Sequence, residues 1–211
     1  MSGLFVVFEG GDGVGKSTQT RLLAQWAQQR GLPVRVTFEP GDTAVGTLIR
    51  QIVLDPATGD LDPRAEALLY AADKAHHLHE VVRPALARGE VVICDRYVDS
   101  MVAYQGAGRV LDAAQVASVA EWATDGLLPD LTVLLDLDPA LAVGNIESPD
   151  RVEQAGLEFH QRARQYFLDL AAAAPQRYLV LGARDDVDAI AERVQARVAE
   201  LLSDPTGRIV P

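Results

Sequence analysis

The feature that most constrains the fold is the glycine-rich segment at residues 10–17, which reads Gly-Gly-Asp-Gly-Val-Gly-Lys-Ser. It satisfies the pattern G-x-x-x-x-G-K-[ST], in which backbone N–H groups surround phosphate oxygens. Such a loop needs a strand before it and a helix after it, because the helix N-terminus adds a favourable dipole. Both are present, as the apolar run Leu4–Phe8 and as helically spaced apolar residues between 22 and 27. We therefore predict that Lys16 reaches the terminal phosphates of a nucleotide and that the Ser17 hydroxyl binds Mg²⁺.

Short apolar runs alternate with helical patterns along the rest of the chain. Further strand-like runs occur at residues 34–38, 91–94, 131–137 and 178–181. Helical spacing is seen for the apolar face Leu68, Leu69, Ala72 and Ala75, and for residues 112–125, 152–174 and 187–202. This alternation predicts an α/β fold with a mostly parallel sheet covered by helices on both faces. No linker or repeat interrupts it, so we expect one domain over residues 1–211 with a frayed tail at 204–211.

Composition excludes several classes of protein. Of the 211 residues, 48% are hydrophobic and 23% charged, which is too apolar for a disordered chain. No apolar run is long enough for a membrane-spanning helix, and the N-terminus lacks the basic flank of a signal peptide. A single cysteine, Cys94, cannot form an internal disulfide, so we expect a cytoplasmic protein.

The charge balance excludes two kinds of partner. The formal net charge is −11, and this argues against nucleic acid and against anionic membranes, which both need a broad basic surface. Lysine is rare, because Lys16 and Lys74 are the only two lysines among 19 basic residues. Mutational bias toward arginine explains the rarity, but each remaining lysine is a candidate for a specific role.

Besides the Ser17 hydroxyl, a carboxylate that binds the metal is expected at the end of another buried strand. Asp95 directly follows the run at residues 91–94, where it can hold the Mg²⁺ shell through water. Cys94 lies within the same run, and we interpret it as a buried, inert thiol.

The motifs beyond the phosphate loop are narrower. Asp95-Arg96-Tyr97-Val98-Asp99-Ser100 precedes Ala103-Tyr104-Gln105-Gly106, and Phe8-Glu9-Gly10-Gly11-Asp12 and Glu39-Pro40-Gly41 stand upstream. Pro129-Asp130-Leu131-Thr132 and Asp150-Arg151-Val152-Glu153 follow in order. Together they resemble bacterial thymidylate kinases, from about Phe5 to Leu202. The phosphate loop is common to many nucleotide-binding proteins, whereas the Asp-Arg-Tyr block with Tyr-Gln-Gly is far more specific.

This resemblance implies a fold and a reaction. The fold would be a P-loop kinase fold, with a five-stranded parallel sheet and a short lid at about residues 141–151. The reaction would be transfer of the γ-phosphoryl group of ATP to dTMP, giving dTDP for dTTP synthesis, with Mg²⁺ as cofactor. The partners would be these small nucleotides and a second copy of the chain in a homodimer.

The resemblance also assigns residues to the donor nucleotide. The phosphates of ATP would be bound by Gly10, Gly11, Asp12, Gly13, Val14, Gly15, Lys16, Ser17 and Thr18. Arg184 follows the last strand and could stack on the adenine, although a plain helix cap by Asp185 or Asp186 explains that loop equally well.

For the acceptor nucleotide, the resemblance implies a phosphate end and a base end. Glu39 and Pro40 would close on the acceptor phosphate, which Arg50 and Arg96 would contact through bidentate guanidinium groups. Asp12 would lie near the deoxyribose 3′-hydroxyl.

At the base end, Tyr70 would stack on thymine. Tyr104 would exclude a 2′-hydroxyl, and Gln105 would contact the base.

Two positions at the base end depart from the family. Lys74 stands where an arginine usually reaches the base, and a lysine gives a less directional contact. Met101, which follows Ser100, replaces a residue that is often a small hydroxyl. Lys74, Ser100 and Met101 are all included in the expected substrate site. Neutral drift with a bridging water explains the departures at Lys74 and Met101 equally well.

The lid departs further. Residues 137–150 contain no arginine or lysine, and the phosphate loop supplies no basic residue at its variable positions. A transition-state arginine can contribute about 10³ to 10⁵ in rate. Arg151, Arg162 and Arg164 are possible substitutes. The expected catalytic residues are Lys16, Asp95, Arg96 and Arg151.

Two groups of side chains are given structural roles. His76, His77 and His79 are interpreted as a solvated helix face rather than a metal site, because no further ligands are indicated. Trp26 and Trp122 are interpreted as packing residues.

Two alternatives to a thymidylate kinase stay open at this point. One is a kinase for a deoxynucleoside or a modified pyrimidine nucleotide, with Glu39 as a base for a neutral hydroxyl acceptor. The other is a nucleotide-binding homologue with weak catalysis, motivated by the lid without basic residues.

Overall fold

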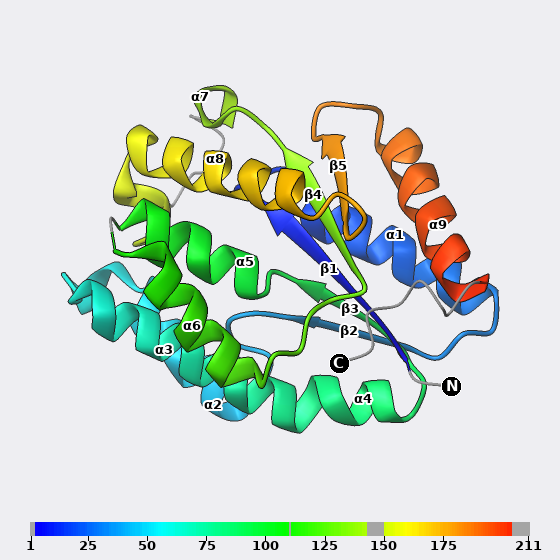
Figure 1. The fold of residues 1–211 in the computed structure, drawn as a ribbon, viewed down its shortest axis with the longest axis horizontal. Coiled ribbons are helices and arrows are strands. Elements are labelled where there is room, and N and C mark those ends of the chain that lie inside the picture. Colours follow the sequence, from blue (N-terminus) through cyan, green and yellow to red (C-terminus); the bar gives the residue numbers. More distant parts are fainter. Residues whose placement is uncertain (1–2, 110, 143–149, 204–211) are drawn as a thin grey trace.

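A computed structural model describes residues 3–109, 111–142 and 150–203 of the protein. Its centre is one parallel sheet whose strands lie in the order β2-β3-β1-β4-β5 (Figure 1). The strands are β1 (Leu4–Gly10), β2 (Val34–Phe38), β3 (Val91–Asp95), β4 (Leu131–Asp136) and β5 (Tyr178–Gly182). The five strand-like runs of the sequence are thus confirmed, and so is the expected five-stranded parallel sheet.

Helices connect each strand to the next, as a parallel sheet requires. The longer ones are α1 (Lys16–Gln29), α2 (Ala44–Leu54), α3 (Pro63–His77), α6 (Ala113–Thr124), α8 (Leu157–Ala173) and α9 (Val187–Ser203). Shorter helical segments are η1 (Pro56–Thr58), η2 (Leu78–Val82), α4 (Arg83–Ala87), α5 (Val98–Met101), η3 (Val102–Gly108), α7 (Pro139–Ala142) and η4 (Glu153–Ala155). The π-helical η2 and η3 extend α3 and α5 without a break.

Both faces of the sheet are covered. Helices α1 and α9 pack on one face, where Leu23 and Val194 contact inward residues of β1, β3 and β4. The segment from η2 to α4 covers the other face, where Leu78 and Val82 pack against Phe5. Helix α8 lies across the β4–β5 side of the sheet (Figure 1). Helices α2, α3 and α6 form an outer group that contacts the sheet through α5 and η3.

Helix α3 faces opposite to the apolar pattern in its sequence. We expected Leu68, Leu69, Ala72 and Ala75 to point into the core. Leu69 is half-buried against it, but Leu68 is 59% exposed and both alanines are exposed. The buried side of α3 is instead mostly polar: Glu66, Tyr70, Asp73, Lys74 and His77. A helix that lines a site turns its polar residues inward, so the hydrophobic period marks the wrong face here.

Trp122 also contradicts its expected role. Trp26 on α1 is buried in the core, as expected, whereas Trp122 on α6 is 84% exposed. A large apolar side chain left in solvent does not serve packing within this chain.

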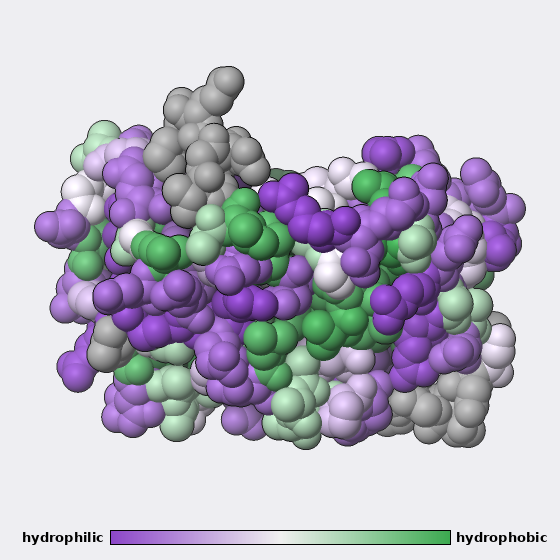
Figure 2. Space-filling model, turned by 90° about the horizontal axis from the view of Figure 1, so that it is seen from above, coloured by the Kyte–Doolittle hydropathy of each residue, from purple (hydrophilic) through white to green (hydrophobic). Residues whose placement is uncertain are grey.

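The fold brings the site-forming loops together at one edge of the sheet. The carboxyl ends of β1, β2 and β3 lie side by side, because their register pairs Phe8 with Asp95 and Asp95 with Phe38. In parallel sheets, ligands bind beyond the carboxyl ends of the strands. The face seen from above in Figure 2 is largely hydrophilic, with hydrophobic side chains gathered in patches toward its middle.

Candidate active site

A cavity of about 890 Å³ opens at the carboxyl ends of β1, β2 and β3. The phosphate loop and the start of α1 form one end, and α3 with the loop after β2 forms the other. Most of the residues expected to bind nucleotides line it, namely Asp12, Gly13, Val14, Gly15, Lys16, Ser17, Thr18, Glu39, Pro40, Arg50, Tyr70, Lys74, Asp95, Arg96, Ser100, Met101, Tyr104 and Gln105. The strand order thus joins segments that are far apart in the sequence.

The phosphate loop has the geometry that its glycines predict. Gly10 has φ 129°, and a Cβ at this position would lie 2.4 Å from the carbonyl oxygen of Leu135. Gly15 has φ 94° and precedes α1 without any side-chain cap. The first N–H groups of α1 are therefore available for an anion.

Lys16 lies within this loop and is almost fully buried. Its ammonium donates to the carbonyl oxygens of Gly10 at 3.2 Å and Gly11 at 2.5 Å. Burial, followed by the charge of Arg96, lowers the pKa of Lys16 to about 8. A cation held in this way is only partly compensated, so a phosphate anion would relieve the penalty of its burial.

Ser17 and Asp95 form an oxygen pair beside Lys16. The Ser17 hydroxyl is 3.3 Å from Asp95 Oδ2. Asp95 Oδ1 is buried and has no hydrogen-bond partner among the described residues. Hydroxyl and carboxylate oxygens are the ligands that Mg²⁺ prefers, so this unpartnered oxygen fits a hydrated Mg²⁺.

Arg96 projects into the cavity from an unusual backbone conformation. Its φ of 68° is left-handed, which is rare for a residue other than glycine and often marks a functional site. The guanidinium forms an ion pair with Asp12 and donates to Gly10 O at 3.1 Å and Ser100 Oγ at 3.0 Å. Burial tends to raise the pKa of Asp12, but the charges of Arg96 and Lys16 outweigh it and lower that pKa.

Glu9 supports Arg96 from behind, a role the sequence analysis missed. The Ser100 hydroxyl donates to Glu9 at 2.5 Å, and Glu9 also accepts from the backbone N–H of Tyr97 at 2.8 Å. Burial and then the charge of Asp99 raise the pKa of Glu9 to about 7. Ser100 therefore links Arg96 to Glu9. The signal was a carboxylate inside an otherwise apolar strand.

The loop after β2 joins α2 and α3 at the far end of the cavity. Arg50 donates to the carbonyl oxygen of Pro40 at 2.7 Å. Glu39 is buried against α3, where it forms an ion pair with Lys74 at 2.5 Å. Lys74 therefore lines the cavity with its ammonium already paired.

Tyr70, Met101 and Tyr104 give the cavity an aromatic and apolar wall. All three are buried to at least nine-tenths, and Tyr104 stacks on Phe159 with ring centroids 5.8 Å apart. Gln105 also lines the cavity, but its amide donates to Glu66 at 2.9 Å.

Glu66 is a second residue that the sequence analysis missed. It is fully buried and accepts hydrogen bonds from Gln105, Arg109 and Arg151. Arg151 also donates to the carbonyl oxygen of Val53 at 3.0 Å. The side chain of Arg151 thus anchors the end of the expected lid to α2 and α3, and it is not among the residues that line the cavity.

The other arginines proposed to replace lid arginines are also engaged elsewhere. Arg162 donates to the carbonyl oxygens of Ala107 and Gly108. Arg164 forms a bidentate pair with Asp136 at 2.7 and 2.8 Å. Arg184, which was expected near the adenine and not as a lid substitute, donates to Leu141 O at 3.2 Å. Residues 143–149 of the expected lid and the tail at 204–211 lie outside the described residues.

The structure tests two further interpretations, one of the loop before α9 and one of the three histidines His76, His77 and His79. Asp186 accepts from the backbone N–H groups of Asp188 and Ala189, so this loop does contain the helix cap. The solvated histidine face is wrong for His77, which is 1% exposed and contacts Glu39 and Thr37. His79 is exposed, and His76 pairs with Glu80 at the surface.

Among the described residues, no helix has the length and apolar character needed to cross a membrane. Comparisons with known proteins agree on one family. The thymidylate kinase family model matches residues 8–194. Thymidylate kinase of Cutibacterium acnes is 60% identical over 203 residues, which cover 96% of this chain and 100% of that protein.

Two further relatives extend the match. Thymidylate kinase of Deinococcus radiodurans is 51% identical over 201 residues, covering 94% of this chain and 97% of that protein. The crystal structure of thymidylate kinase from Ehrlichia chaffeensis superposes with a TM-score of 0.79 at 30% identity. That alignment covers 94% of this chain and the whole of the other.

Proposed function

The chain belongs to the thymidylate kinase family, and we propose how its own residues carry out the reaction of that family. It transfers the γ-phosphoryl group of ATP to dTMP and so produces dTDP for dTTP synthesis. The observation that carries the proposal is that Lys16, Arg96 and Arg50 all line the same cavity. Two polyanions must approach in line there, and these cations are placed to neutralise their oxygens.

The donor phosphates bind at the phosphate loop. The N–H groups at the start of α1 and the ammonium of Lys16 surround the β- and γ-phosphates. Transfer then depends mainly on positioning and on charge, since the attacking phosphate oxygen of dTMP is already ionised near neutral pH. No general base is required.

The acceptor binds between Arg96 and α3. Arg96 and Arg50 hold its phosphate, and Tyr70 stacks on the thymine ring. Asp12 exchanges its ion pair with Arg96 for contacts near the 3′-hydroxyl. The buried position of Tyr104 against Phe159 supports its role in excluding a 2′-hydroxyl.

The activity has a direct test. Purified protein with ATP and MgCl₂ is expected to convert dTMP to dTDP, with ADP formed in equal amount and both measured by anion-exchange chromatography. Replacing dTMP with dUMP removes one methyl group and is expected to lower kcat/KM by about 10- to 200-fold. Thymidine should not be phosphorylated, because it lacks the phosphate that the arginines bind. Turnover of thymidine but not of dTMP would contradict the assignment.

We also propose that Ser17 and Asp95 hold Mg²⁺, which when bound neutralises charge on the β- and γ-phosphates. The buried, unpartnered Oδ1 of Asp95 supports this site.

Replacing Asp95 with asparagine is expected to raise the Mg²⁺ concentration that gives half-maximal activity by about tenfold or more, because one ligand charge is lost. The measurement is a Mg²⁺ titration of initial rates. Asp169→Asn removes the same charge from an exposed position on α8 and should leave the titration unchanged. Identical Mg²⁺ dependence for D95N and wild type would exclude Asp95 from the metal site.

We propose that the protein works as a homodimer through the outer faces of α2 and α3. Four large apolar side chains on these helices are at least 41% exposed: Val45, Leu48, Ile52 and Leu68. Helices α2 and α3 pack against each other, so these residues lie on neighbouring elements. A second copy of the chain would bury them.

The double variant L48D/L68D is expected to shift the molar mass in size-exclusion chromatography with light scattering from dimer to monomer. A carboxylate buried in an apolar interface is too costly to retain. Val187→Asp places the same charge at an exposed apolar position on α9 and should leave the mass unchanged. A monomeric wild-type protein would refute the proposed dimer.

A cytoplasmic location completes the proposal. It is supported by the single, buried cysteine, because one cysteine cannot form the internal disulfides that are typical of oxidising compartments. The nucleotide substrates also support it.

A further inference from the structure

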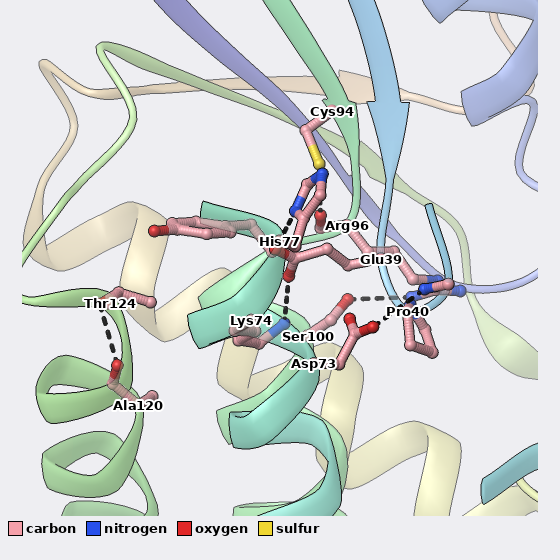
Figure 3. A network of polar contacts seen from close by, with 12 residues as sticks. Glu39, Pro40, Asp73, Lys74, His77, Cys94, Arg96, Ser100, Ala120 and Thr124 are labelled. Atoms are coloured by element: carbon pink, nitrogen blue, oxygen red, sulfur yellow. Dashed lines mark hydrogen bonds and ion pairs between the residues drawn. The ribbon is translucent and has the colours of Figure 1, made fainter. Parts of the chain in front are cut away.

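His77 is a buried histidine whose two ring nitrogens both meet polar partners. Its Nδ1 is 2.7 Å from Glu39 Oε1 (Figure 3). Its Nε2 is 2.5 Å from the hydroxyl of Thr37. The side chains of His77 and Glu39 are each 1% exposed. A carboxylate oxygen can only accept, so the ring donates from Nδ1.

Two residues of α3, His77 and Lys74, hold the carboxylate of Glu39. One carboxylate oxygen takes the Nδ1–H of His77, and the other takes the Lys74 ammonium at 2.5 Å. Burial tends to raise the pKa of Glu39, but Lys74 and then His77 outweigh it and lower that pKa. With both oxygens occupied, the carboxylate has one orientation.

The same loop makes two further contacts directly after Glu39. The carbonyl oxygen of Pro40 accepts from Arg50, and the backbone N–H of Gly41 donates to Asp73 at 3.2 Å. Arg50 is the expected ligand of the acceptor phosphate. The orientation of Glu39 therefore fixes the loop on which Arg50 depends.

Lys74 gains its position from the same arrangement. Its side chain is 3% exposed, its ammonium is paired with Glu39, and it lies 5.7 Å from the Tyr97 ring centroid. The ammonium that was expected to reach the base is thus paired with a carboxylate. The ammonium neutralises Glu39 and is not free to bind the base.

Building on the proposed function, we propose that His77 is a positioning residue for dTMP. By holding Glu39 against Lys74, it fixes the Glu39–Gly41 loop and thereby the carbonyl oxygen that aligns Arg50. His77 does not line the cavity and touches no reacting atom, so it acts through Glu39. Because the phosphate loop lies at the other end of the cavity, ATP binding is independent of it.

Two amide variants separate the two nitrogens. In His77→Asn the side-chain amide NH₂ lies near the place of Nδ1 and keeps the donor to Glu39. In His77→Gln it lies near the place of Nε2 and keeps only the contact with Thr37. Both variants remove the ring, so a purely structural role would affect them alike.

Steady-state kinetics and thermal unfolding of the full-length protein test the proposal. We expect H77Q to raise the KM for dTMP by about tenfold, the loss typical of a hydrogen bond to a charged group. We expect H77N to stay within about threefold of wild type, and the KM for ATP to be unchanged in both variants. His79→Gln makes the same change at an exposed position of η2 and should leave the KM for dTMP unchanged.

Two results would overturn the proposal: equal KM values for dTMP in H77N and H77Q, or an increase in KM for ATP that matches the increase for dTMP. If H77Q does not fold, a tenfold increase in the KM for dTMP of H77N overturns the proposal, because that variant keeps the donor to Glu39. A wild-type protein without dTMP kinase activity would instead refute the proposed function.

Discussion

Replacing Lys16 with methionine is expected to lower kcat for phosphoryl transfer by at least about a hundredfold. The ammonium is the only lysine charge in the phosphate loop, and the loop supplies no other cation. Removal of one preorganised donor from a developing charge typically costs about 10² to 10³ in kcat. Methionine keeps most of the buried volume, so the loss is one of charge.

The same variant is expected to have an unchanged or higher Tm. Burial lowers the pKa of Lys16 from its ordinary value of 10.5 to about 8. Below pH 8 the folded protein therefore holds a charge that the unfolded chain accommodates more easily, and stability rises with pH between these two values. Removing the ammonium removes this penalty, although Gly10 and Gly11 lose a donor to their carbonyl oxygens.

Quenched-flow measurement of ADP formation and thermal unfolding at pH 7 test both parts together. The matched control is Arg193→Met, which removes an exposed cation from α9 and should change neither quantity. If K16M kept wild-type kcat, Lys16 would not contact the transferred phosphate. If its Tm fell sharply, the ammonium would serve the fold rather than the reaction.

The sequence predicts the centre of the sheet well because β3, β1 and β4 are buried on both faces. Continuous apolar runs such as Leu4–Phe8 identify such strands without knowledge of their neighbours. Helix α3 shows where this reasoning fails. Leu68, Ala72 and Ala75 are exposed, while Glu66 and Lys74 are buried because they have partners that periodicity cannot reveal.

The residues of the site also fall into those that the sequence predicts and those that it does not. The phosphate loop is local, so Lys16 and Ser17 were predicted from eight consecutive residues. Among contacts between distant segments, the meeting of Ser17 with Asp95 was predicted, but others were not. Glu66 meets Arg151 across 85 positions and His77 meets Glu39 across 38. The spacing of residues along one helix cannot show that a histidine faces a carboxylate on another segment.

The second large effect is expected at Arg96. Arg96→Ala should lower kcat by about 10³ or more, the contribution of an arginine that stabilises charge at a transferred phosphoryl group. Its guanidinium is oriented by Gly10 O, Ser100 and Asp12, and it shares the cavity with Lys16. Arg96→Lys keeps the charge but loses the bidentate fork, so we expect most of the loss to remain.

Arg151 provides the comparison that makes this result specific. It is the last residue of the expected lid and was predicted to supply the missing transition-state charge, yet its guanidinium is bound by Glu66 and Val53 O. Arg151→Met should therefore lower kcat less than about tenfold while lowering Tm, because Glu66 would lose one of its buried cationic partners. Single-turnover rates for R96A and R151M rank the two residues. A larger loss of rate in R151M than in R96A would mean that Arg151 leaves Glu66 during catalysis. The positive charge for phosphoryl transfer would then come from the end of the expected lid.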